Sequence, residues 1–218
     1  MVRRSWVLVA VAAAVGVAGC DVGTGVGAVA GTLFVDPCTV DGTLGTLAAP
    51  VAFNLKPSYF VADPVNDVMG LHPKNKVSIR VQSTGNSVEE ADVLFVGVSN
   101  VGEAANQLGQ PLPVGADTNV RATLGLNRTC PKHSVQIELD GTIQFTRFGI
   151  VPDAGAPPDF RISFNDPITA SFSLNVVDRR ALTLGGTGGV STVPSVGGHL
   201  DGNFDFRVQQ GRGAQQFP

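Results

Sequence analysis

Apolar and polar residues alternate in several short stretches of the chain, as they do in half-buried β-strands. Residues 93–98 are apolar at nearly every position, which indicates a central strand covered on both faces. Shorter apolar stretches bounded by glycine, proline or aspartate add further candidates. The strands predicted from these patterns are residues 31–36, 51–55, 59–61, 77–82, 93–98, 120–126, 135–139, 143–145, 160–164, 168–177 and 204–208.

Two segments that lie 61 residues apart share a pattern. Residues 134–145 read SVQIELDGTIQF, and residues 195–206 read SVGGHLDGNFDF. Asp140-Gly141 is a turn signal, so we expect a hairpin whose three-residue loop places Ile137 opposite Phe145. Two copies of one hairpin would suit a sandwich, but both segments also fit generic hairpins that carry a phenylalanine after the turn.

Two segments carry helical signals. Asn100 followed by Glu103 resembles a capping box, and Gly109 is a stop signal, which together predict a two-turn helix over residues 101–108. Asp63 before Pro64 has the form of a helix start, and it predicts a single helical turn at this point of the chain.

These elements predict an all-β fold, a single antiparallel β-sandwich or jelly-roll-like domain with one or two short helical turns. We place the β-sandwich domain at residues 31–210, with a glycine-rich loop at residues 185–198 and a frayed tail at residues 211–218. High glycine and proline content agrees with short strands joined by tight turns.

The N-terminus has the layout of a signal peptide. Arg3 and Arg4 precede an apolar run over residues 6–17 that is too short to span a membrane. The run ends in Val17-Ala18-Gly19-Cys20, which resembles the lipobox of bacterial lipoproteins, although that family prefers leucine where Val17 stands. An ordinary secretory signal with a chance cysteine is the alternative interpretation.

The resemblance implies that residues 1–19 are removed and that Cys20 carries lipid, so that the lipid is the protein's membrane partner. Residues 20–30 are then the lipidated N-terminus and a flexible tether, although a first strand through Val26 also fits the pattern. The implied location is the bacterial cell envelope, lipid-anchored, on the periplasmic face or the cell surface.

Lipidation of Cys20 leaves two cysteines, Cys38 and Cys130, in an oxidising compartment. We therefore predict a disulfide between them. Two free thiols or a metal pair are the alternatives, but two cysteines without CxxC spacing make a poor metal site.

Charge and aromatic content exclude some functions. Removal of Arg3 and Arg4 with the leader leaves 13 basic against 18 acidic residues, a formal charge of −5, so we expect no nucleic-acid partner. The only tryptophan, Trp6, leaves with the leader, and Tyr59 is the only tyrosine. This scarcity of aromatic side chains with a polar edge argues against a carbohydrate-binding module, and the phenylalanines are expected in the core.

The sequence nominates no catalytic, cofactor-binding or metal-binding residues. The three histidines, His72, His133 and His199, are widely spaced, and no nucleophile elbow or phosphate-binding loop occurs. We therefore expect no enzyme and no cofactor, but a non-catalytic structural or protein-interaction module with an envelope protein as partner. The alternatives are a small-ligand or metal-binding lipoprotein accessory to transport, and a hydrolase with an unrecognised site.

Overall fold

A computed structural model describes residues 22–35, 51–64, 76–84, 90–130, 135–152, 160–162, 166–177 and 196–209. These residues form one helix, α1 (Val101–Asn106), and twelve strands: β1 (Val22–Val35), β2 (Val51–Leu55), β3 (Tyr59–Pro64), β4 (Val77–Gln82), β5 (Asp92–Val98), β6 (Pro111–Val114), β7 (Val120–Leu126), β8 (Gln136–Phe148), β9 (Ile150–Pro152), β10 (Phe160–Ile162), β11 (Ile168–Val177) and β12 (Val196–Gln209). The predicted all-β class is confirmed.

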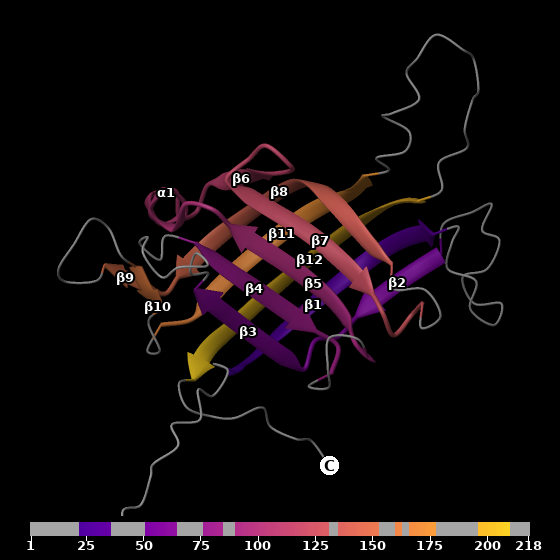
Figure 1. The fold of residues 1–218 in the computed structure, drawn as a ribbon, viewed down its shortest axis with the longest axis horizontal. Helices are drawn as coiled ribbons and strands as arrows, with labels where there is room; N and C mark the ends of the chain where they lie inside the picture. Colours follow the sequence, from indigo (N-terminus) through magenta and orange to yellow (C-terminus); the bar gives the residue numbers. More distant parts are fainter. Residues whose placement is uncertain are drawn as a thin grey trace, which may run out of the picture.

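Ten strands form one large sheet that folds over into two layers, so the domain is sandwich-like (Figure 1). One layer contains β3, β4, β5 and β7, and the other contains β1, β12, β11 and β8. The layers are joined where β1 pairs with β3 and where β7 pairs with β8. The pairings are antiparallel apart from one parallel bridge, between Val114 and Val120. β9 and β10 form a separate two-stranded sheet.

The core lies between the two layers and contains a continuous run of phenylalanine rings. Phe60 of β3 stacks on Phe206 of β12 with ring centroids 5.2 Å apart. Phe206 contacts Phe204 at 5.8 Å, and Phe204 contacts Phe172 of β11 at 6.3 Å. Because phenylalanine has no polar group to satisfy, such rings bury a large apolar area and join β3 to the opposite layer.

The predicted flexible tether is wrong for residues 22–30, which form the first two thirds of β1. This strand pairs with β12 along its whole length. Its glycines resemble a linker in composition, but several lie opposite large rings: Gly25 faces Phe206 and Gly27 faces Phe204. A Cβ on Gly25 would meet the Asp205 carbonyl oxygen and Cβ of Phe206, so only a residue without a side chain fits against β12 at this position.

The hairpin predicted at Asp140-Gly141 is also wrong. β8 runs through this point as one strand, and Ile137, Leu139, Ile143 and Phe145 are all buried on its inner side. The period-2 pattern therefore continues across the turn signal, because β11 pairs with β8 on both sides of it. Gly141 adopts a φ of 134°, a conformation that L side chains rarely adopt.

The second copy of the pattern behaves in the same way. Leu200, Asp201 and Gly202 lie inside β12, which is the other neighbour of β11. The sequence pattern that the two segments share thus belongs to two long strands that flank β11, and neither segment forms a hairpin. β12 begins at Val196, so the loop predicted over residues 185–198 ends earlier than expected.

The predicted helix is confirmed and is slightly shorter than expected. α1 begins after Asn100, whose side-chain oxygen accepts a hydrogen bond from the Glu103 amide at 3.1 Å. Gly109 has a φ of 78°, as expected for a glycine that follows a helix. The separate helical turn predicted to start at Asp63 and Pro64 is not formed there, because both residues belong to β3.

Candidate functional site

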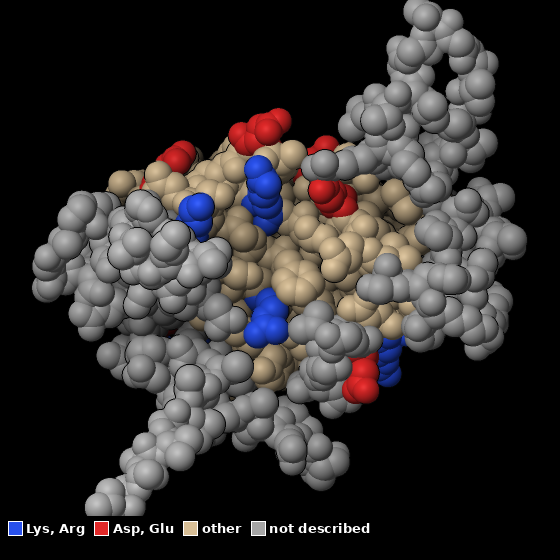
Figure 2. All heavy atoms as spheres, in the orientation of Figure 1, with Lys and Arg blue, Asp and Glu red and all other residues tan. Residues whose placement is uncertain are grey.

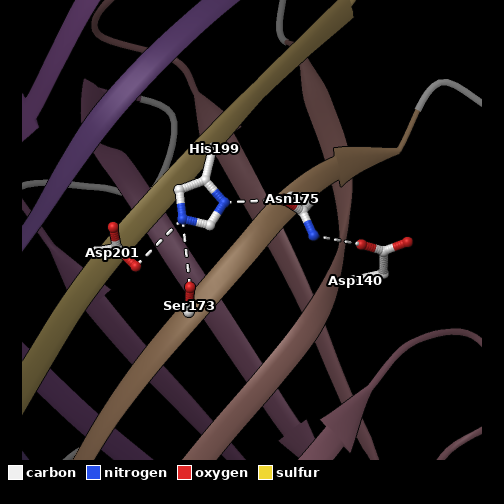
Figure 3. A network of polar contacts seen from close by, with 5 residues as sticks. All are labelled: Asp140, Ser173, Asn175, His199 and Asp201. Carbon is white, nitrogen blue, oxygen red and sulfur yellow. Dashed lines mark hydrogen bonds and ion pairs between the residues drawn. The ribbon is translucent and has the colours of Figure 1, made fainter.

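A connected set of polar side chains lies on the outer face of β8, β11 and β12 (Figure 3). The strand register places His199 of β12 beside Asn175 of β11, and Asn175 beside Asp140 of β8. Two residues further along, on the same face, Asp201 of β12 lies beside Ser173 of β11. The five residues come from three strands that are distant in sequence, and we call them the His199 network.

The hydrogen bonds of the network fix which nitrogen of His199 carries a proton. Asn175 donates from Nδ2 to the Asp140 carboxylate at 3.3 Å, so its Oδ1 faces the other way. This oxygen only accepts, and it lies 2.8 Å from Nδ1 of His199. Nδ1 must therefore be the donor, and in the neutral ring the lone pair is on Nε2.

Two oxygens lie within hydrogen-bonding distance of Nε2. Ser173 Oγ and Asp201 Oδ1 each lie 3.2 Å from it. In the neutral ring Ser173 can donate its hydroxyl proton to Nε2, but the Asp201 carboxylate then faces a second acceptor. A proton on Nε2, or a cation between Nε2 and the carboxylate, removes this conflict.

The network has some of the contacts of a hydrolase site and lacks its shielding. A serine hydroxyl at the imidazole and an oriented ring are what an activated nucleophile needs. However, the side chain of His199 is 46% exposed and that of Asp201 is 68% exposed, on the face of a strand. Water therefore reaches both groups, and Asp201 competes with Ser173 for the same nitrogen, which disfavours nucleophilic catalysis.

A second polar arrangement has a structural role. Asp92 at the start of β5 is only 7% exposed. Its Oδ1 accepts hydrogen bonds from the amides of Arg128 and Thr129 at 3.0 and 2.9 Å, and its Oδ2 accepts one from the Thr129 hydroxyl at 2.6 Å. These bonds hold the turn that follows β7 and ends at Cys130, which is almost fully buried.

A shallow depression of about 250 Å³ lies where β8 ends and β11 begins. It is lined by Leu108, Thr146, Arg147, Phe148, Gly149, Asp166 and Pro167. Leu108, one of these lining residues, is 43% exposed. Arg147 and Asp166 supply one charge of each sign at its wall.

The structure gives different information on each residue that the sequence nominated. Cys20, Cys38, His72 and His133 lie outside the described residues, so lipidation and the disulfide stay predictions. His199 is not isolated, contrary to its appearance in the sequence. The partners Ser173 and Asn175, and Asp201 beside His199, were missed because they come together only through the strand register. Ser173 and Asn175 are two residues apart on β11, and His199 and Asp201 are two residues apart on β12. This spacing is the one signal in the sequence that could have suggested that each pair shares a face.

Comparison with protein-family models, with curated proteins and with solved structures gave no match. Within the described part of the chain, no helix is long and apolar enough to cross a bilayer. The same residues contain no group of three or more His, Cys, Asp or Glu side chains that could hold a metal ion. Function must therefore be inferred from the sequence motif at the N-terminus and from the surfaces of the domain.

Proposed function

We propose that the protein is a bacterial envelope lipoprotein, anchored through lipid on Cys20 on the periplasmic face or the cell surface. Its domain acts as a non-catalytic structural or protein-interaction module. The observation that carries the proposal is Val17-Ala18-Gly19-Cys20 at the end of an apolar run of signal-peptide length. Among the described residues the helix α1 is a single short one. An acylated cysteine would therefore provide the membrane attachment of the domain.

Substitution of the lipidated cysteine tests the anchor. Cys20→Ala should move the protein from the membrane fraction to the soluble fraction and leave a precursor that retains its leader. Val17→Leu is the matched control, because leucine is the residue that the lipobox prefers, and it should leave processing unchanged. Membrane fractionation that is the same for Cys20→Ala and the natural chain would refute the anchor.

The outer face of β8, β11 and β12 supports an interaction role. It exposes short polar side chains in register, among them Asn203 beside Ser171. Neighbouring strands lie about 4.8 Å apart, so their side chains form a flat array of donors and acceptors. Figure 2 shows the molecule from the side of β3, β4, β5 and β7, where charged side chains are scattered among uncharged ones. The polar outer face of β8, β11 and β12 suits a protein partner that is recognised by hydrogen bonds.

Photo-crosslinking in living cells tests this face. A photoreactive residue at Ser171 should give a specific protein adduct, which Asn203→Lys should abolish because the lysine would crowd the same face. Arg121 of β7 is an exposed control position in the other layer and should give no such adduct. Adducts of the same pattern from Ser171 and Arg121 would argue against a dedicated interaction face.

The second candidate is metal binding at the His199 network, as a small-ligand or metal-binding lipoprotein accessory to transport would need. The observation that favours it is the Nε2 lone pair of His199 facing the Asp201 carboxylate. A histidine whose other nitrogen donates to a fixed acceptor is the usual arrangement for a metal ligand. Zn²⁺ accepts nitrogen and carboxylate ligands together, and water would complete its coordination.

Titration with Zn²⁺, followed by the NMR signals of the His199 ring, tests this candidate. Saturable shifts are expected in the natural domain, and Asp201→Asn should weaken them strongly. Asp205→Asn is the matched control, because Asp205 is another exposed aspartate of β12. Equal shifts in both variants, or none in the natural domain, would eliminate the metal candidate.

A further inference from the structure

The start of β1 fixes which end of the domain lies next to Cys20. Val22 pairs with Gln209 of β12 and with Val61 of β3. The strands therefore place the beginning of β1, the end of β12 and the end of β3 at one end of the two-layered sheet, at the left in Figure 1. The helix α1 and the beginning of β11 lie at the same end, which we call the anchor end.

Only Asp21 separates Cys20 from this strand. The two residue steps from Cys20 to Val22 span at most about 7 Å of extended chain. β1 is held by β12 along its whole length, so the domain cannot lengthen this connection without breaking strand pairs. From this geometry we propose that the anchor end of the domain rests directly on the phospholipid headgroups. The proposal depends on the lipidation of Cys20.

The side chains exposed at the anchor end suit this contact. Leu108 and Val26 are the exposed large hydrophobic side chains among the described residues, at 43% and 70% exposure. Leu108 follows α1, and it lines the depression at the end of β8 and the start of β11. Val26 lies four residues after the start of β1, about 13 Å along the strand. Both apolar side chains therefore lie in the half of the domain that is nearer to the lipid.

The charges at the depression agree with a zwitterionic surface. Arg147 is exposed and can meet a lipid phosphate, while Asp166 can meet a headgroup amine. The His199 network lies towards the other end, because His199 is only three residues after the start of β12. The His199 network thus remains accessible while the anchor end contacts the bilayer.

Tryptophan quenching in vesicles tests the orientation. The mature chain has no tryptophan, because Trp6 belongs to the leader, so Leu108→Trp reports on one position alone. The lipidated full-length protein is reconstituted in phosphatidylethanolamine vesicles that contain brominated lipid. Emission from position 108 should shift to the blue and be quenched. The matched control is Gln136→Trp, an exposed position at the start of β8 and at the opposite end, which should show neither effect.

A longer connection provides the second test. Insertion of about ten glycine and serine residues between Asp21 and Val22 adds roughly 17 Å of mean reach and should reduce quenching at position 108. Equal quenching at positions 108 and 136 in lipidated, vesicle-bound protein would overturn the orientation while leaving the lipoprotein proposal intact. Protein that lacks lipid by mass and does not bind vesicles would overturn both.

Discussion

Glycine opposite phenylalanine is the residue-scale feature that explains most about this fold. Gly25 and Gly27 of β1 lie opposite Phe206 and Phe204 of β12, and Gly202 of β12 lies opposite Phe172 of β11. A Cβ on Gly202 would meet the Phe172 ring, whereas a Cβ on Gly25 or Gly27 would meet the backbone carbonyl oxygen of Asp205 or Asn203. The high glycine content, which the sequence alone presents as turns and linkers, is therefore partly a packing device of the core.

Substitution of one of these glycines tests the packing. Gly25→Ala should destabilise the domain by about 1–3 kcal/mol, because the new methyl group would meet the Asp205 carbonyl oxygen and the Cα and Cβ atoms of Phe206, which cannot move independently. Gly97→Ala is the matched control in β5: its Cβ would meet nothing within 4 Å, and the loss of backbone freedom favours folding by about 0.5–1 kcal/mol. Urea unfolding measures both. Equal stability of the two variants would contradict the packing account.

The tautomer of His199 provides a second residue-scale prediction. Because Asn175 accepts from Nδ1, the neutral ring should carry its proton on Nδ1, which nitrogen-15 NMR of the ring detects directly. Asn175→Ala removes that acceptor and should shift the population towards the Nε2-protonated form. A neutral ring that is protonated on Nε2 in the natural domain would mean that the network is not formed in solution.

At the scale of elements, β1 is the point where sequence and structure differ most. If residues 22–30 were a tether, their amides would exchange with solvent at the rate of unfolded chain. As part of β1, the amides of residues 29–33 have β12 on one side and β2 on the other. Their hydrogen exchange should be slowed to the level of the core strands. Fast hydrogen exchange across residues 22–33 would contradict the strand pairing and support the interpretation of this segment as a tether.

The elements also show what sequence pattern can and cannot reveal. β4, β7 and β11 were predicted closely, because buried and more exposed residues alternate over most of each strand. The turn signal at Asp140-Gly141 gave a wrong hairpin prediction, because the local preference of these residues for a turn was outweighed by pairing with strands remote in sequence. The His199 network was invisible for the same reason, since the register that brings Ser173 beside Asp201 is a property of the folded sheet.

At the scale of the whole molecule, the predicted disulfide would join two distant parts of the chain. β1 ends at Val35, three residues before Cys38, and β7 ends four residues before Cys130, both at the end opposite to the anchor. Reduction of the bridge, or Cys38→Ser, should lower stability by about 2–5 kcal/mol, because it would release a loop of roughly 90 residues. A domain equally stable before and after reduction would refute the bridge.

The proposed anchor would account for the orientation proposed for the domain, for the exposed Leu108 and for the position of the His199 network towards the opposite end. The mass of the N-terminal peptide, from protein purified out of membranes, tests it most directly. The lipoprotein proposal predicts a peptide that begins at Cys20 and carries acyl chains on that residue. A peptide that begins elsewhere, or an unmodified Cys20, would contradict it.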